Sequence, residues 1–256
     1  GAIVLQDTVR SDTDITDDLG SATIRWRAGY FRSLYGNRFR ATPEIREQLF
    51  IWELGTTSAE LGAEIPPPQL TVRTNTGGSV RPSGSGQIRL KTDLDAAGST
   101  AAIENLAAAN SARTTVWTVT KNPYLRAEFA LEVNDSRQRV FIGYRLTLGD
   151  AVPAAGEHHA GLLWNGTNWQ AVCGNASAQT TANVTIAAAA RHTVEIWIES
   201  ATAVEVWVDG VLASRLTTNI PTGTMDWQVL ADVPTGTGAL DDGILTVGEL
   251  IMQETV

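Results

Sequence analysis

The chain has 256 residues, of which 43% are hydrophobic and 18% charged, and its formal net charge is −9 at pH 7. This composition excludes a disordered chain and supplies enough apolar surface for a core. The acidic balance argues against nucleic acid and anionic membranes as partners, and the apolar runs are too short to span a bilayer.

The first segment, residues 1–68, interleaves aromatic side chains with arginines. Arginine and aromatic residues are enriched in protein interfaces, and the aspartates just before this run can pair with the arginines. We therefore predict a packing surface between chains rather than a nucleic-acid site. The residues assigned to this oligomer interface are Arg25, Trp26, Arg27, Tyr30, Phe31 and Tyr35.

The same segment contains one predicted helix, over residues 43–54. Pro43 suits the first helical position and the preceding Thr42 can cap it. Ile45, Leu49 and Trp52 then recur at helical spacing, and Gly55 can end the helix. The first segment is thus predicted to be a small oligomerising unit of β structure and a short helix.

A domain boundary is predicted near residue 68, where Pro66, Pro67 and Pro68 form a stiff extended connector. From residue 69 to residue 256, short apolar runs alternate with turn residues at the spacing of a β-sandwich or jelly roll. The expected strands are residues 87–91, 114–120, 124–133, 139–148, 160–164, 169–173, 193–199, 203–208, 226–231 and 244–252. The fold class is therefore mainly β, a jelly-roll sandwich that follows the first segment. The alanine-rich residues 101–109 could form a helix on propensity, and their structure is left open.

The clearest local pattern is a hairpin over residues 193–210. Its β-branched residues alternate with polar and aromatic ones, so that Ile196 is predicted to pair with Val206, and Trp197 with Glu205. One face of this hairpin is predicted to lie in the core. Asp209 and Gly210 form the expected turn into a further strand.

Residues 18–31 (DLGSATIRWRAGYF) resemble a short element of bacteriophage tail fibres and tailspikes. In that family the element belongs to an intertwined, usually trimeric β structure. Residues 192–252 resemble the end of a concanavalin-like or laminin-G-like jelly roll, an architecture that phage virion proteins, secreted glycanases and lectins share. The first resemblance implies a homotrimeric virion protein, and the second supports the fold more than any activity.

The outer face of the hairpin carries a candidate glycan-binding patch, made of Glu195, Trp197, Glu205 and Trp207. Tryptophan can stack on sugar rings and carboxylates can accept hydroxyl hydrogen bonds. Glu195 and Glu199 also resemble the paired carboxylates of jelly-roll glycosidases, which is an alternative, hydrolytic interpretation.

A second candidate glycan contact is formed by Trp164 and Trp169, which flank an Asn-Gly hairpin tip. The pair is either a binding tip or a cross-strand pair that stabilises the hairpin.

The sequence contains few candidates for a metal site or a reactive nucleophile. His158 and His159 lack a second ligand cluster and are predicted to be a solvated loop pair rather than a metal site, and the turn at Asp242 lacks the alternating ligands of a calcium loop. Cys173 lies in an apolar strand and is predicted to be inert. We therefore expect no metal, no cofactor and no enzymatic activity.

These observations favour a bacteriophage virion protein of fibre or receptor-binding type, assembled in the host cytoplasm as a homotrimer. Its expected partners are other virion proteins and a host surface glycan, without membrane insertion. Two alternatives remain open: a capsid-decorating head fibre, and a polysaccharide-binding or glycan-hydrolysing jelly roll.

Overall fold

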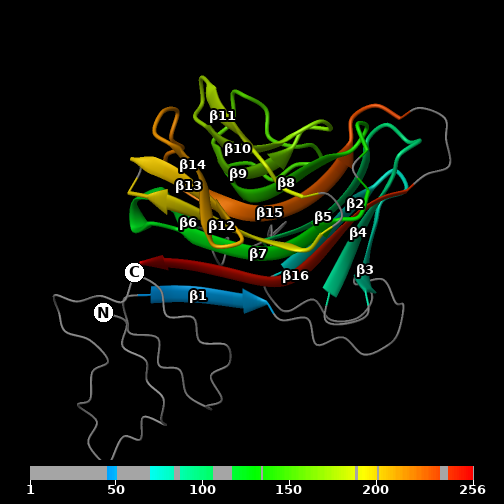
Figure 1. The fold of residues 1–256 in the computed structure, drawn as a ribbon, viewed down its shortest axis with the longest axis horizontal. Helices are drawn as coiled ribbons and strands as arrows, with labels where there is room; N and C mark the ends of the chain where they lie inside the picture. Colours follow the sequence, from blue (N-terminus) through cyan, green and yellow to red (C-terminus); the bar gives the residue numbers. More distant parts are fainter. Residues whose placement is uncertain are drawn as a thin grey trace, which may run out of the picture. The chain divides into compact units, whose positions relative to one another are not determined.

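The computed structural model describes residues 45–50, 70–83, 87–105, 117–133, 135–187, 190–200, 202–236 and 242–255. The described residues form two antiparallel sheets that face each other (Figure 1). The predicted jelly-roll β-sandwich is confirmed.

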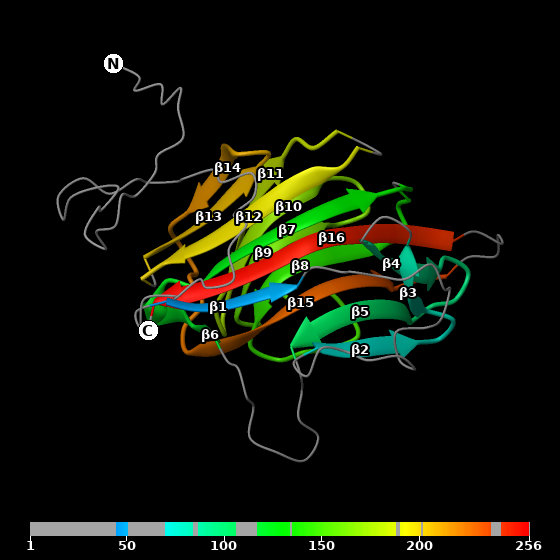
Figure 2. The same ribbon diagram turned by 90° about the horizontal axis from the view of Figure 1, so that it is seen from below.

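The first sheet has the order β14-β13-β12-β7-β16-β4-β3, and β1 also pairs with β16. Its long strand β16 has β7 along one side, while β4 and β1 lie end to end along the other (Figure 2). The strands of this sheet are β1 (Ile45–Phe50), β3 (Ser79–Ser83), β4 (Gln87–Asp93), β7 (Tyr124–Leu131), β12 (His192–Glu199), β13 (Ala203–Val208), β14 (Val211–Leu216) and β16 (Asp242–Thr255).

The second sheet has the order β11-β10-β9-β8-β15-β5-β2, and β6 also pairs with β15. A short 3-10 helix, η1 (Val119–Lys121), follows β6. The strands of this sheet are β2 (Leu70–Asn75), β5 (Ser99–Asn105), β6 (Trp117–Thr118), β8 (Arg139–Arg145), β9 (His159–Trp164), β10 (Trp169–Gly174), β11 (Gln179–Val184) and β15 (Thr224–Val233).

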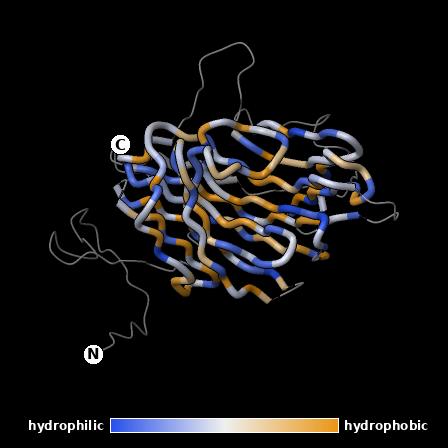
Figure 3. Tube along the Cα trace, turned by 90° about the horizontal axis from the view of Figure 1, so that it is seen from above, coloured by the Kyte–Doolittle hydropathy of each residue, from blue (hydrophilic) through white to orange (hydrophobic). Residues whose placement is uncertain are grey.

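The core lies between the sheets and follows from alternation along the strands. In β12, Val194, Ile196 and Ile198 are fully buried, whereas the residues between them are half-buried or exposed. Hydrophobic and hydrophilic positions alternate in the same way along many strands in Figure 3. A period of two residues places every second side chain on the inner face, where burial of apolar surface stabilises the sandwich.

One prediction for the chain before residue 70 needs revision. The helix predicted over residues 43–54 is wrong for Ile45–Phe50, which form β1 and pair antiparallel with Phe50 opposite Leu250. Pairing with a neighbouring strand outweighs local helix propensity at these positions. The first sheet therefore includes a strand from within residues 1–68. The predicted boundary near residue 68 lies outside the described residues and stays a prediction.

The alanine-rich region also resolves into a strand at its start. Residues up to 105 form β5, in which Ala101, Ala102 and Ile103 are fully buried. Small side chains fit this position because β5 is covered on both faces.

Candidate functional site

The predicted hairpin forms as β12 and β13, with the predicted register. Ile196 lies opposite Val206, Trp197 opposite Glu205, and Glu195 opposite Trp207. The turn into β14 is made by Asp209 and Gly210, both at positive φ, as an Asp-Gly hairpin turn requires. The structure thus brings Glu195, Trp197, Glu205 and Trp207 together on the outer face of the first sheet.

Trp197 is the exposed aromatic residue at the centre of this group. Its side chain is 43% exposed, although it stands in the middle of a paired strand. The ring of Tyr124, directly opposite on β7, meets it edge-on with 6.3 Å between ring centroids. The Tyr124 hydroxyl donates a 2.9 Å hydrogen bond to Glu195 Oε2, so the aromatic ring and the carboxylate beside Trp197 hold each other in place.

Trp207 occupies a more enclosed position one strand further. It is half-buried, and its Nε1 donates to Glu205 Oε2 at 3.1 Å. Arg215 on β14 binds the other oxygen of Glu205 and also Glu199, the latter at 2.7 Å. We refer to Tyr124, Arg126, Glu195, Trp197, Glu205 and Trp207 as the Trp197 surface.

The hydrolytic interpretation of Glu195 and Glu199 fits this geometry poorly. The two residues are four positions apart on one strand, which separates their backbones by about 13 Å. Retaining glycosidases need carboxyl groups about 5–5.5 Å apart, and inverting ones about 6.5–9.5 Å. Trp197 stands between them, and Arg215 holds Glu199 on the side of β14.

Trp164 and Trp169 do not join the Trp197 surface. They lie opposite each other in the β9–β10 hairpin, with ring centroids 5.6 Å apart. They are only 6% and 4% exposed and pack in the core cluster, so neither ring offers a face to a sugar. The structure therefore favours the stabilising pair over the binding tip.

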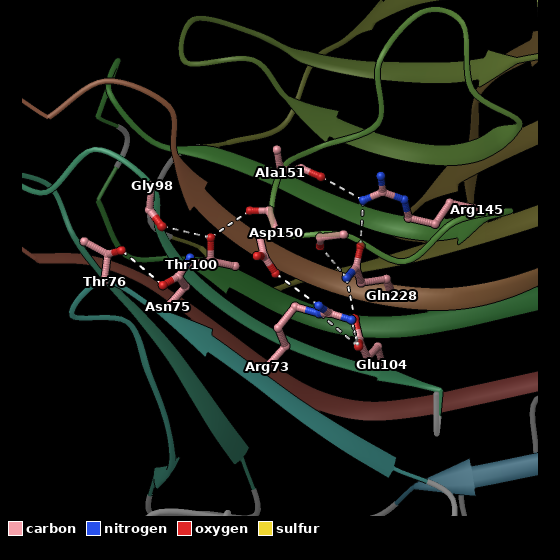
Figure 4. A network of polar contacts seen from close by, with 11 residues as sticks. Arg73, Asn75, Thr76, Gly98, Thr100, Glu104, Arg145, Asp150, Ala151 and Gln228 are labelled. Carbon is pink, nitrogen blue, oxygen red and sulfur yellow. Dashed lines mark hydrogen bonds and ion pairs between the residues drawn. The ribbon is translucent and has the colours of Figure 1, made fainter. Parts of the chain in front are cut away.

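A second polar group lies on the outer face of the second sheet, beneath the segment 146–158 that joins β8 to β9 (Figure 4). Glu104, Arg145 and Gln228 are at most 3% exposed there. Gln228 Nε2 donates to Glu104 Oε2 at 2.5 Å and to the Gly149 carbonyl at 2.9 Å. Arg145 donates to Gln228 Oε1 at 2.9 Å and to the Ala151 carbonyl at 2.7 Å.

This network ties the segment to the sheet. Arg73 bridges Glu104 and Asp150, at 2.7 and 3.2 Å, and the Thr100 hydroxyl donates to the Asp150 carbonyl at 2.7 Å. An apolar cluster lies under the same segment, with Val152 packed against it: Ala102, Phe141, Leu163, Val172 and Leu230. The outer face of the second sheet is therefore filled by the chain itself at this place.

Two ionisable groups beneath or beside this segment are shifted toward their neutral forms. Desolvation by burial raises the pKa of Asp232 to about 7, against hydrogen bonding from the Val152 amide and the charges of Arg139 and Arg145. Burial also lowers the pKa of His159 to about 4. The prediction that His159 is solvated is therefore wrong, because it is fully buried.

The network residues were missed by the sequence analysis. Asp226, Gln228 and Asp232 alternate with the core residues Trp227 and Val229 along β15, which is a period-two signal. That alternation indicates a polar outer face, but it cannot show that a distant segment covers it.

The remaining predicted sites are placed as follows. Among the described residues, no group of three or more His, Cys, Asp and Glu could hold a metal ion. Cys173 is buried, and desolvation raises the pKa of its thiol to about 12, which suppresses thiolate reactivity. Asp242 begins β16 and pairs with Lys91 at 2.7 Å.

The predicted oligomer interface lies outside the described residues, as does the tail-fibre-like element at residues 18–31, and both stay predictions. Searched across the described part of the chain, no helix is long and apolar enough to cross a membrane.

Comparison with known proteins identifies the fold. No family model matches the sequence, and no curated protein matches it. The chain is similar to a protein of unknown function from Shewanella oneidensis MR-1, with a TM-score of 0.61 and 12% identity over 83% of this chain and 87% of that one.

Two further similar structures are of proteins whose names refer to carbohydrates. One is an immunostimulatory antigen and pseudo β-1,3-glucanase of Mycobacterium tuberculosis, with a TM-score of 0.53 and 10% identity over 75% of this chain and 94% of that one. The other is the carbohydrate recognition domain of Emp47p, also with a TM-score of 0.53 and 10% identity, over 78% of this chain and 95% of that one. At these identities the likeness concerns the sandwich architecture.

Proposed function

We propose that this chain is a carbohydrate-binding jelly roll and that it binds glycans through the Trp197 surface. The observation that carries the proposal is Trp197 itself, which is 43% exposed on a paired strand, with Glu205 opposite it on β13 and Tyr124 opposite it on β7. An exposed large aromatic residue costs hydration free energy unless a partner covers it, and sugar rings present the apolar C–H faces that stack on indole.

The carboxylates around Trp197 can accept hydrogen bonds from the hydroxyl groups of a sugar stacked on its ring. Glu195 and Glu205 flank the ring on β12 and β13, and each has its position fixed by a hydrogen bond from an aromatic side chain. A preorganised acceptor binds a hydroxyl with little loss of side-chain entropy. The similar structures agree with this proposal, since they include a carbohydrate recognition domain.

Replacement of Trp197 by alanine tests the proposal. Wild type is first screened against neutral oligosaccharides, with cellohexaose, laminarihexaose and mannohexaose as probes, by isothermal titration calorimetry. Trp197→Ala is expected to weaken the binding more than tenfold, or about 1.4 kcal/mol, because the stacking face is lost.

Val211→Ala is the matched control, because Val211 is 68% exposed on β14 and lies outside the Trp197 surface. The control should bind as wild type does, and both variants should keep the wild-type β-sheet circular dichroism. Binding that survives Trp197→Ala unchanged, or a wild type that binds none of a broad glycan array, would overturn the proposal.

A further inference from the structure

The arginines around the Trp197 surface are already occupied by carboxylates of the same face. Arg126 reaches Glu249 on β16 at 2.5 Å, and Arg191 reaches Glu128 on β7 at 3.5 Å. Arg215 binds two carboxylates, those of Glu199 and Glu205. Each of these guanidiniums faces a carboxylate of the same sheet, and that negative charge offsets the attraction that the guanidinium would exert on the carboxylate or sulfate of an acidic sugar.

Glu195 differs from the other carboxylates of this face. Arg126 lies directly opposite it on β7, yet the guanidinium turns to Glu249 on the next strand. Among the described residues, the Glu195 carboxylate accepts its side-chain hydrogen bond from the uncharged Tyr124 hydroxyl. Its negative charge is therefore not compensated by a cation in contact among the described residues.

The position of this charge matters because Glu195 and Trp197 are two residues apart on the same strand face, roughly 7 Å along the strand. A sugar stacked on Trp197 would place its ring substituents beside Glu195. A negative charge on the sugar at that place would be repelled by the Glu195 carboxylate, and more strongly where water is displaced and the local dielectric falls. A hydroxyl at the same place would instead donate a hydrogen bond to the free carboxylate oxygen.

We infer that the Trp197 surface selects uncharged glycans over acidic ones, and that Glu195 is the residue that determines this selectivity. The inference rests on the proposed function, since it names the class of sugar that the same surface takes. It gives Glu195 two effects, acceptance of a hydroxyl hydrogen bond and repulsion of a sugar carboxylate or sulfate.

The test is Glu195→Gln, which keeps the shape of the side chain and an oxygen that accepts from Tyr124, but removes the charge. The probes are the best neutral hexasaccharide of the screen and hexagalacturonate, titrated at 20 mM and 500 mM NaCl. Wild type should bind the neutral probe at least tenfold more tightly than hexagalacturonate at low salt. Glu195→Gln should bind the neutral probe within about threefold of wild type and gain at least fivefold for hexagalacturonate at 20 mM NaCl.

The salt dependence distinguishes an effect of the Glu195 charge from an effect of its shape. The gain for hexagalacturonate should shrink at 500 mM NaCl, because exposed charges are screened there within a few ångströms. Glu132→Gln is the control, since it makes the same change in net charge one residue beyond the end of β7, where Glu132 pairs with Arg89. This variant should leave both affinities at the wild-type values.

The failures of the two proposals are distinguishable. Wild type that binds hexagalacturonate as tightly as the neutral probe, with both lost in Trp197→Ala, would overturn the selectivity and keep the glycan site. A Glu195→Gln variant without a gain for hexagalacturonate, or with one that ignores salt, would overturn the role of Glu195. Wild type that binds neither probe nor any other glycan overturns the proposed function itself.

Discussion

His159 and Asp232 show how burial decides the charge of single residues in this fold. The neutral tautomer of His159 donates from Nδ1 to the Glu157 carbonyl at 2.8 Å and accepts at Nε2 from the Gln179 amide at 2.9 Å. Protonation of Nε2 would place its N–H against the N–H of the Gln179 amide, so this hydrogen bond would be lost. The buried site also disfavours the positive charge of the imidazolium. Burial likewise disfavours the charged form of Asp232. Its Oδ1 is buried without a hydrogen-bond partner, so ionisation of this carboxyl group is costly.

Asp232→Asn should therefore stabilise the protein at alkaline pH. The pKa of Asp232 is about 7 in the folded state and 3.8 as its ordinary value, so the folded protein keeps a proton that the unfolded chain releases. Between these two pH values the free energy of unfolding falls as pH rises, and above pH 7 the whole loss is present. We expect the variant to exceed wild type by about 2–4 kcal/mol at pH 8, with a much smaller difference at pH 4.

Urea denaturation at pH 4, 6 and 8 measures this difference. The exposed Asp242, which pairs with Lys91, provides the control Asp242→Asn, whose effect should stay within about 1 kcal/mol at each pH. An advantage of Asp232→Asn that is the same at all three pH values would contradict the argument.

The tryptophans show how much of the candidate site could be predicted from the sequence. The alternation in β12 and β13 placed Trp197 and Trp207 on one face, because a one-residue slip would have exposed the whole β-branched stripe. The same pattern could not separate Trp197 from Trp164 and Trp169. All are tryptophans in strands, and whether a ring is covered depends on the opposite sheet, which the local sequence does not specify.

At the scale of elements, the segment 146–158 is held by side chains rather than by strand pairing. The first anchor is Gln228, whose amide is shared among Glu104, Arg145 and the Gly149 carbonyl. Its removal leaves buried polar partners unsatisfied, each at a cost of about 1–3 kcal/mol. Local opening of this segment should then require much less free energy than unfolding of the sandwich.

Gln228→Ala is expected to speed amide hydrogen exchange in residues 146–158 at least tenfold, while β12 and β13 change much less. Mass-spectrometric hydrogen exchange gives both rates in one experiment. Gln170→Ala is the matched control, because Gln170 makes a single exposed side-chain bond to Asn183. Equal acceleration in every strand would show that Gln228 acts on the whole fold and not on this segment.

Element boundaries were predictable where the period of the sequence is clear and no distant partner intervenes. The predicted strand at 203–208 coincides with β13, whose apolar and polar residues alternate, and the one at 160–164 falls within β9, a short apolar run that ends at an Asn-Gly turn. The predicted helix over residues 43–54 failed because β1 owes its conformation to β16, which lies about two hundred residues later. Strand β11, with its sequence QTTANV, has little apolar patterning and owes its conformation to pairing with β10.

On the scale of the whole molecule, the architecture was the most predictable feature. Many short alternating strands without intervening long helices leave few options other than a sandwich. The covering of the second sheet was not predictable, because it depends on contacts such as Arg73 with Asp150, from β2 to the β8–β9 connection. The total charge of −9 agrees with a binding surface that disfavours acidic sugars, although it does not locate that surface.

The position of β16 has a consequence for synthesis of the protein. This strand lies between β7 on one side and β4 and β1 on the other, so the first sheet stays in separate pieces until it is added. A nascent chain on the ribosome must keep the apolar faces of these pieces from aggregating until residues 242–255 emerge. A ribosome-bound chain stalled before residue 242 should therefore be cut rapidly by protease, whereas one extended by a linker beyond residue 256 should resist.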